Sequence, residues 1–333
     1  MRAVTLLALL LLQGCATAHV EQLLRGHTMG SEWTVKLAGA PREDAAMLAA
    51  GVQQRFDAVV AQMSTYEPGS DLSRFNQSPP DAWQRLPPEL FAVLGYALQL
   101  ARDTDGAYDP TIGPLVNLWG FGPDPKRNTT PDADAIRAAR ARVGWRRIEL
   151  DAGNRSARHA PDTYVDLSSL AKGFGVDEVA RYLDAQGVTD YLIDLSGKLR
   201  AGGVNARRVP WRVAVERPGP DGNDSLDAIT TDAAVDLTDR AVASAGDYRR
   251  FFIADGRQYS HIIDPVSGVP VGHALASVTV LAADCLTADA LATALLVLGP
   301  EAGLAHARRH RIAALFVIRE GASLAVLRTE DWP

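Results

Sequence analysis

The chain has 333 residues, of which 47% are hydrophobic and 22% are charged, and this composition excludes a disordered protein. The length is sufficient for one large or two medium globular domains with a substantial core. A formal net charge of −6, without a Lys/Arg stripe, argues against a nucleic-acid partner, so an anionic ligand would need local positive charge from a cation, a lysine or backbone N–H groups.

The N-terminal residues have the pattern of an export signal, because one positive charge at Arg2 precedes an apolar run that is too short to span a bilayer comfortably. The run ends in Leu-Gln-Gly-Cys15, which resembles a bacterial lipobox, although Gln13 replaces the usual small residue. We expect a signal peptide over residues 1–18 with acylation at Cys15, and a single domain over residues 19–333. Cleavage without lipidation is the alternative.

The first half of the chain combines strand and helix patterns with one unusual loop. In order, the patterns predict a strand at 30–37, a helix at about 41–63, a polar segment at 64–76 and an amphipathic helix at about 88–102. Residues 106–122 are broken by Gly and Pro, yet they are rich in apolar and aromatic side chains. Because loops are normally polar and exposed, we expect this loop to cover either the core or a ligand.

The second half of the chain mixes strands and helices without the regular alternation of a doubly wound sheet. The predicted elements are helices near 131–142, 169–186, 285–298 and 301–309, a hairpin-like stretch at 148–165, and strands at 191–195, within 211–263, and at 277–281, 313–318 and 324–327. We therefore expect an α+β fold with mixed or antiparallel sheets and packed helices.

The helix predicted at 285–298 is almost entirely apolar and carries one carboxylate, Asp289, with the hydroxyl of Thr293 one turn later on the same face. A buried carboxylate is usually paired, protonated or bound to metal, and an all-oxygen set suits Mg²⁺ or Ca²⁺. The alternative is that Asp289 only complements the helix dipole, with Asp284 or Thr287 as the cap. Cys285 is expected to be a small core residue.

A second candidate segment is 164–177, where a strand ends at Asp166 and a serine pair opens a helix with Lys172 in its first turn. A helix N-terminus with a lysine is a reasonable phosphate site, and an ordinary capped helix with a solvated lysine is the alternative. Ser169 and Lys172 also fit the Ser-x-x-Lys pattern of penicillin-recognising serine acylases, but the later Lys-Thr-Gly is replaced by Val-Ser-Gly at 266–268.

A third candidate segment begins at His261 and continues into a turn with Asp264. The turn alone explains Asp264 in structural terms. The neutral imidazole of His261 is a candidate proton acceptor near neutral pH, and a hydrogen-bonded scaffold histidine is the alternative. The usual nucleotide signatures, a phosphate loop and Gly-x-Gly-x-x-Gly, are missing from the sequence.

Taken together, seven segments in chain order resemble the ApbE family, the FAD:protein FMN transferases. These segments are 28–31, 64–76, 106–122, 166–173, 244–248, 261–268 and 288–293. The resemblance implies an α+β, T-fold-related architecture with an FAD cleft between lobes. It also implies Mg²⁺-dependent transfer of the FMN half of FAD to a threonine or serine of a client protein, with release of AMP.

The resemblance also implies roles for individual residues. The metal ligands would be Asp289, Thr293 and the backbone oxygen of Ser169. The FAD contacts would be Met29, Tyr66, Ala107, Tyr108, Asp109, Asp166, Lys172 and Ile263, with Tyr66 stacking on a ring and Lys172 near the phosphates. We expect His261 to accept or relay the proton of the client hydroxyl and Asp264 to orient His261.

The chain departs from the family pattern in two places. The family often has Gly-Gly-Glu where this chain has Ser-Gly-Lys198. It commonly has Gly-Gly or Ser-Ala where this chain has Ser168-Ser169. We expect neither departure to touch the metal side chains. The first replaces an acid by a base, and we expect it to alter the local charge near the site.

The resemblance finally implies a location and a class of partner. It implies a periplasmic, membrane-anchored lipoprotein whose clients carry an Asp-Ser/Thr-x-x-Ser/Thr-Gly-Ala-Ser/Thr motif. Candidate clients are subunits of the sodium-pumping NADH:quinone reductase, the Rnf complex, or the flavoprotein that supports nitrous-oxide reductase. The alternatives are a lipoprotein that stores FAD and an FAD pyrophosphatase that gives FMN and AMP; a serine acylase is a remote alternative.

Overall fold

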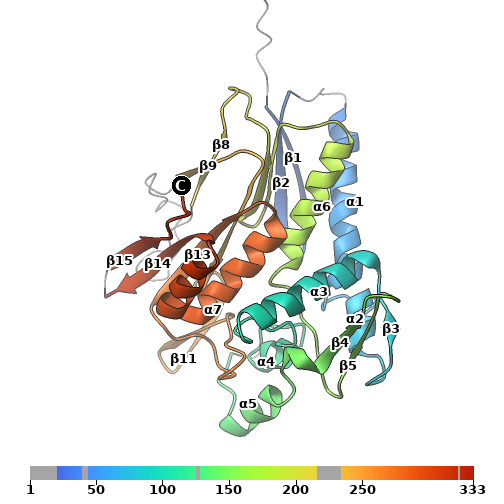
Figure 1. Ribbon diagram of the computed structural model, residues 1–333, viewed down its shortest axis with the longest axis vertical. Coiled ribbons are helices and arrows are strands. Elements are labelled where there is room, and N and C mark those ends of the chain that lie inside the picture. The colour runs from blue at the N-terminus through green and yellow to red at the C-terminus, as the bar shows by residue number, and fades with distance from the viewer. Residues whose placement is uncertain (1–20, 40–43, 125–127, 216–233, 322) are drawn as a thin grey trace, which may run out of the picture.

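The structure, a computed structural model, describes residues 21–39, 44–124, 128–215, 234–321 and 323–333, so the predicted signal peptide lies outside the described residues (Figure 1). The centre of the fold is an eight-stranded sheet with the order β1-β2-β6-β7-β10-β13-β14-β15, in which every neighbouring pair is antiparallel. Its strands are β1 (Glu21–Thr28), β2 (Ser31–Ala38), β6 (Tyr191–Leu195), β7 (Lys198–Gly202), β10 (Ala241–Gly246), β13 (Leu275–Ala282), β14 (Ala313–Glu320) and β15 (Ser323–Arg328).

Both faces of this sheet are covered, which explains why its central strands are apolar without alternation. One face packs against three helices, α1 (Ala45–Met63), α6 (Ala171–Ala185) and α7 (Cys285–Arg309). The other packs against the hairpin of β8 (Trp211–Ala214) and β9 (Ala234–Leu237). Along β14, Leu315 and Val317 contact the cluster with this hairpin, whereas Ala314 and Phe316 contact the cluster with α7. We call this part the sheet lobe.

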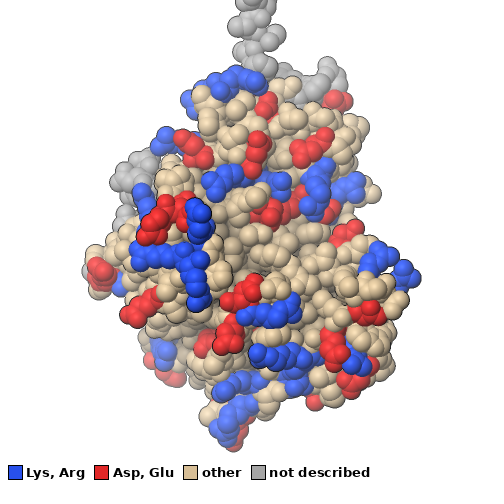
Figure 2. All heavy atoms as spheres, viewed as in Figure 1, with Lys and Arg blue, Asp and Glu red and all other residues tan. Residues whose placement is uncertain are grey.

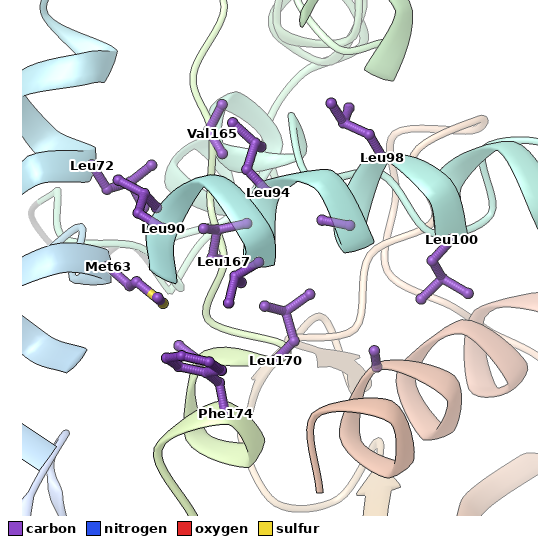
Figure 3. Packing of buried hydrophobic residues seen from close by; sticks show 14 of the residues in the cluster. Met63, Leu72, Leu90, Leu94, Leu98, Leu100, Val165, Leu167, Leu170 and Phe174 are labelled. Atoms are coloured by element: carbon purple, nitrogen blue, oxygen red, sulfur yellow. The ribbon is translucent and has the colours of Figure 1, made fainter. Parts of the chain in front are cut away.

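The remaining elements form a smaller helical lobe beside the sheet lobe. It contains the helices α2 (Asp71–Asn76), α3 (Pro88–Asp103), α4 (Gly113–Leu118) and α5 (Ala133–Arg140), the 3₁₀ turn η2 (Trp145–Arg147), and a small sheet of β3 (Gln84–Arg85), β5 (Ser156–His159) and β4 (Ile148–Asp151). Figure 3 shows how Leu90 and Leu94 of α3 pack against Leu167, Leu170 and Phe174. This apolar contact fixes the segment that leads into α6.

The apolar loop predicted at 106–122 contains α4 and covers part of the core. The ring of Trp119 stacks on Tyr259 and Phe252, and Phe121 packs against Phe252. These partners belong to the hairpin of β11 (Phe251–Ala254) and β12 (Arg257–Ser260). The aromatic side chains of the loop therefore tie the helical lobe to the hairpin that precedes residue 261.

The predicted break at Gly299 is present inside α7, where Gly299 has a φ of 82° and a ψ of −178°, outside the helical region. The helix therefore consists of two segments joined at Gly299-Pro300. By length and composition alone α7 is apolar enough to cross a membrane, but half of its most apolar window is buried within the protein, between the sheet and its neighbouring helices. Cys285 is fully buried, as expected of a core residue.

The close contact between α6 and α7 depends on a glycine and two carboxylates. A Cβ at Gly173 would lie 2.4 Å from the Cys285 carbonyl oxygen, so the two backbones approach as only a glycine allows. Asp284 caps α7 by accepting a bond from the Thr287 N–H at 2.8 Å, so of the two candidate caps Asp284 is the one that serves. Asp177 of α6 accepts bonds from the N–H groups of residues 285 and 286 at 2.9 and 2.8 Å. Together these carboxylates satisfy the first turn of α7.

Basic and acidic side chains are interspersed over the face of the molecule in Figure 2. This face therefore offers no extended basic surface of the kind that binds a nucleic-acid backbone.

We expect Asp177→Ala to lower the free energy of unfolding by about 3 kcal/mol. It removes one of the two carboxylates that cap α7, and it leaves the partly buried Arg200, whose Nη1 lies 2.5 Å from Asp177, without its partner. Urea denaturation followed by circular dichroism measures the change. Asp134→Ala, which removes an exposed carboxylate from α5, is the matched control and should change stability by less than about 1 kcal/mol. Equal effects of the two substitutions would disprove the capping role.

Candidate active site

Asp289 is the centre of the candidate site. It lies in the second turn of α7 and is 3% exposed. Its Oδ2 accepts a hydrogen bond from the Gly173 N–H at 3.1 Å, and its Oδ1 lies 2.9 Å from Lys198 Nζ. The buried carboxylate is thus paired with an ammonium group and a backbone amide from two other elements. Because its partners are outside α7, complementing the helix dipole does not account for it.

Lys198 reaches Asp289 from the tight turn between β6 and β7. Ser196 and Gly197 both have left-handed φ angles, 54° and 77°, and Leu195 pairs directly with Lys198, which is a two-residue hairpin turn. Lys198 Nζ also donates to the Ser244 carbonyl at 2.6 Å. Lys198, the residue at which the chain departs from the family pattern, therefore contacts the candidate metal ligand directly. The expectation that this departure leaves the metal side chains untouched is wrong.

Of the other two predicted metal ligands, Thr293 contacts the backbone of Asp289, and Ser169 precedes by four residues the glycine that binds the Asp289 carboxylate. The Gly173 N–H donates to Asp289, so it does not engage the Ser169 carbonyl four residues earlier, as it would in a longer helix. The Thr293 hydroxyl donates to the backbone carbonyl of Asp289 at 3.2 Å and keeps its oxygen lone pairs for another partner.

This donor set fits a hard divalent cation. It consists of a carboxylate, a hydroxyl and a carbonyl, and its carboxylate already attracts a cation in the form of the Lys198 ammonium. Over the described part of the chain, no group of three or more His, Cys, Asp or Glu side chains is placed to hold a metal. A metal at Asp289 would therefore depend on one carboxylate and neutral oxygen ligands.

Several basic residues gather near Asp289, and two of them, Lys198 and Lys172, interact with its carboxylate. Burial lowers the pKa of Lys172, and the charges of Lys198, Arg249 and Arg250 lower it further, while Asp289 opposes the shift. Lys172 Nζ donates to the hydroxyl of Ser31 at the start of β2, at 3.1 Å. This excess of positive charge favours a bound anion. Sequence reasoning identified Lys172 and missed the two arginines, which follow the predicted motif at 244–248.

His261 is held with one ring nitrogen available as a proton acceptor. Its Nδ1 lies 3.0 Å from the backbone carbonyl of Arg250, so Nδ1 carries the proton and Nε2 keeps its lone pair. Burial lowers the pKa of His261 to about 4, and the charges of Arg250, Lys198 and Arg249 act in the same direction against the bond to the Arg250 carbonyl. His261 is therefore neutral near pH 7.

The expectation that Asp264 orients His261 is corrected by the structure. The carboxylate of Asp264 accepts bonds from the N–H groups of Val266 and Ser267 at 2.9 and 3.2 Å and so shapes its own turn. The Arg250 carbonyl contacts the imidazole instead. Ile263 forms a bridge with residue 270, and its side chain is buried with the α4 cluster.

Three of the predicted FAD contacts, Tyr66, Met29 and Ala107, are exposed or partly buried. The ring of Tyr66 is 52% exposed, and its hydroxyl donates to the Phe121 carbonyl at 3.0 Å, which leaves a face for stacking. Met29 occupies the β1–β2 turn at a φ of 48° and packs between the helical lobe and α1. Ala107 is half-buried in the loop before Tyr108.

The other predicted FAD contacts hold two loops together. Tyr108 is buried, and its Oη accepts a bond from the Ser169 hydroxyl at 3.1 Å. Asp109 accepts bonds from the N–H and hydroxyl of Thr111 and from the Trp145 N–H, and burial raises its pKa. Asp166 accepts the Ser168 N–H at 2.8 Å, while its own N–H donates to the carbonyl of residue 110. These carboxylates position the loops beside the candidate metal ligands.

The geometry also addresses the serine-acylase alternative. Lys172 Nζ contacts the hydroxyl of Ser31, whereas the hydroxyl of Ser169 contacts Tyr108. The Ser-x-x-Lys pair does not form the Ser–Lys contact that an acylase nucleophile needs.

Comparisons with known proteins identify the family. The sequence matches the ApbE family over residues 29–316. An FAD:protein FMN transferase from Vibrio cholerae is 40% identical over 317 residues, which cover 95% of this chain and 93% of the relative. One from Escherichia coli K12 is 35% identical over 333 residues, 97% of this chain and 93% of the relative.

Solved structures give the same result. The flavin transferase ApbE from Vibrio cholerae has a TM-score of 0.86 at 37% identity over 94% of this chain and 98% of that chain. The apo form of the Pseudomonas stutzeri flavinyl transferase ApbE has a TM-score of 0.84 at 39% identity over 94% of this chain and 96% of that chain. The α+β prediction and the resemblance of the seven motifs are thereby confirmed, and this chain belongs to the ApbE family.

Proposed function

We propose that this protein transfers the FMN half of FAD to a serine or threonine hydroxyl of a client protein and releases AMP. The observation that supports it most directly is the buried Asp289 carboxylate, which pairs with Lys198 and interacts with Lys172, in a chain whose relatives are named FAD:protein FMN transferase. In the reaction the client oxygen forms a bond to the phosphorus of the FMN phosphate. The bond from that phosphorus to the bridging oxygen breaks, AMP leaves with that oxygen, and the client hydroxyl loses its proton.

The residues of the chain account for positioning and charge in this step. Asp289, Thr293 and the Ser169 carbonyl would hold Mg²⁺, which supplies neutralisation of the diphosphate charge when bound. Lys172 and the two arginines at 249 and 250 offset the remaining negative charge. The exposed ring of Tyr66 offers a stacking surface for FAD between the two lobes.

His261 is proposed to accept the proton of the client hydroxyl at Nε2. Its Nδ1 is fixed by the Arg250 carbonyl, so the accepting nitrogen is set by the fold and not by a second side chain. Because the lowered pKa makes protonated His261 a stronger acid than an ordinary imidazolium, it releases the proton to solvent readily.

The direct test of the function uses FAD, Mg²⁺ and a client that carries the Asp-Ser/Thr-x-x-Ser/Thr-Gly-Ala-Ser/Thr motif. The proposed clients are subunits of sodium-pumping NADH:quinone reductase or Rnf type, or the flavoprotein that supports nitrous-oxide reductase. Transfer gives a fluorescent client band that survives denaturation and an intact mass increased by FMN. AMP release without client labelling would indicate FAD hydrolysis, and FAD binding without AMP release would indicate storage.

Asp289→Asn should reduce client labelling on the order of 100-fold or more, because it keeps the shape of the side chain and removes the carboxylate from the proposed set of metal ligands. The rate of appearance of the fluorescent band measures the effect. Asp134→Asn, on the exposed surface of α5, is the control and should label at the rate of the unmodified protein. Undiminished labelling by the Asp289 variant would refute the assignment of the site.

The pH dependence of kcat/KM should show an acid limb near pH 4 and none near 6.5, because the pKa of His261 is lowered to about 4. The sign follows from the neutral form being the acceptor: His261 is protonated only below its pKa, so activity falls as the pH drops through about 4. His261→Gln should lower labelling by about 100-fold and remove this limb. A limb near 6.5 that disappears in the variant would contradict the lowered pKa.

We further propose that the chain is exported to the periplasm, that residues 1–18 are the signal segment and 19–333 a single domain, and that Cys15 carries a lipid anchor. The support is the charge, apolar run and lipobox-like tetrad of the N-terminus, which lies outside the described residues.

Cys15→Ser should move the full-length protein from the membrane fraction to the soluble fraction and abolish incorporation of labelled fatty acid. Fractionation followed by immunoblotting measures the distribution. Cys285→Ala, at the buried second cysteine, is the matched control and should remain in the membrane fraction. If the Cys15 variant stays with the membrane, the anchor proposal is wrong.

A further inference from the structure

We propose that Lys198 is a built-in competitor for the divalent cation: its ammonium group holds the cation position on Asp289, and a metal binds there only by displacing it. The inference rests on the metal site of the proposed function. It concerns a residue that none of the candidate roles above includes.

The two carboxylate oxygens of Asp289 have different partners. Oδ2 of Asp289 accepts the Gly173 N–H at 3.1 Å, and this bond is fixed by the contact between the backbones of α6 and α7. Oδ1 is therefore the oxygen that remains for a cation, and Lys198 Nζ lies 2.9 Å from it. The ammonium group and a metal would use the same atom.

Electrostatic repulsion opposes simultaneous binding of a metal and the Lys198 ammonium group at Asp289. Asp289 is 4% exposed and Lys198 14% exposed at their side chains, so solvent screens little of the charge between them. A divalent ion bound to Oδ1 would lie beside an ammonium group in a poorly screened site that already contains Lys172, Arg249 and Arg250. Strong repulsion makes the two cations alternatives at this oxygen.

The Lys198 ammonium group has a second hydrogen-bond partner besides Asp289. Its Nζ also donates to the Ser244 carbonyl at 2.6 Å, so the ammonium group keeps one partner when it leaves Asp289. The backbone of Lys198 is fixed by the β6–β7 turn and by pairing with Ala243, whereas its side chain is long and flexible. Displacement therefore requires rotation of one side chain and no change in the sheet.

A coupling between ligands follows. A diphosphate in the site would attract the displaced ammonium group and lower the cost of moving it, so FAD and metal should each tighten the binding of the other. In the FAD-free protein, Lys198 should keep the affinity for metal low.

The test is Mn²⁺ binding to the FAD-free protein without client, followed by electron paramagnetic resonance of free Mn²⁺ and by calorimetry. Lys198→Gln should bind Mn²⁺ at least about tenfold more tightly than the unmodified protein. Lys198→Arg keeps the charge and is the matched control, with affinity no higher than that of the unmodified protein. Asp289→Asn combined with Lys198→Gln should lose the gain.

Lys198→Met, which keeps the length of the side chain, serves as a second neutral variant, and circular dichroism with thermal unfolding verifies that each variant is folded. Mn²⁺ affinity that is unchanged in both neutral variants, or no Mn²⁺ binding by any of them, would overturn the proposal. FMN transfer by the unmodified protein is measured separately. Failure of transfer therefore counts against the proposed function, whereas failure of the affinity change counts against the role of Lys198.

Discussion

The contact of Asp289 with Gly173 and Lys198 is the interaction on which the candidate site depends, because it joins α7, α6 and β7 at one carboxylate. Burying that carboxylate is tolerable only while it is paired and hydrogen-bonded. Both conditions come from backbone geometry. Gly173 lets its N–H reach α7, and the tight turn before Lys198 aims the ammonium group. Asp177 stabilises the helix that carries Asp289 by accepting hydrogen bonds from its first N–H groups.

How far the sequence predicts the molecule depends on whether a feature is local. The break of α7 at Gly299, the cap at Asp284 and the buried carboxylate at Asp289 were predictable, because each follows from residues within one helix. The capping by Asp177 and the pairing of Lys198 join elements far apart in the chain, and neither periodicity nor spacing reports such contacts. A charged residue directly after a two-residue turn was the only local signal at Lys198.

At residues 261–268 the prediction assigned Asp264 a role in the site that the structure does not support. The Asp-Pro turn already accounted for Asp264, and that simpler interpretation is the one the structure supports. The orienting group for His261 is a backbone carbonyl, that of Arg250, and a backbone group leaves no trace in side-chain patterns. Catalytic geometry built from main-chain atoms is therefore the part of a site that sequence reasoning misses most easily.

The turn between β6 and β7 positions Arg249 as well as the ammonium group of Lys198. A Cβ at Gly197 would lie 2.9 Å from Arg249 Nη2, and the Ser196 carbonyl accepts a hydrogen bond from Arg249 Nη1 at 3.5 Å. The same two turn residues thus hold Lys198 over Asp289 and leave room for the neighbouring guanidinium group. Because Lys198 and Arg249 both lower the pKa of His261, the charge of this turn reaches the proposed proton acceptor as well. A change of residue type at 198 therefore acts on the cation position and on the histidine together, and the two effects have the same electrostatic origin.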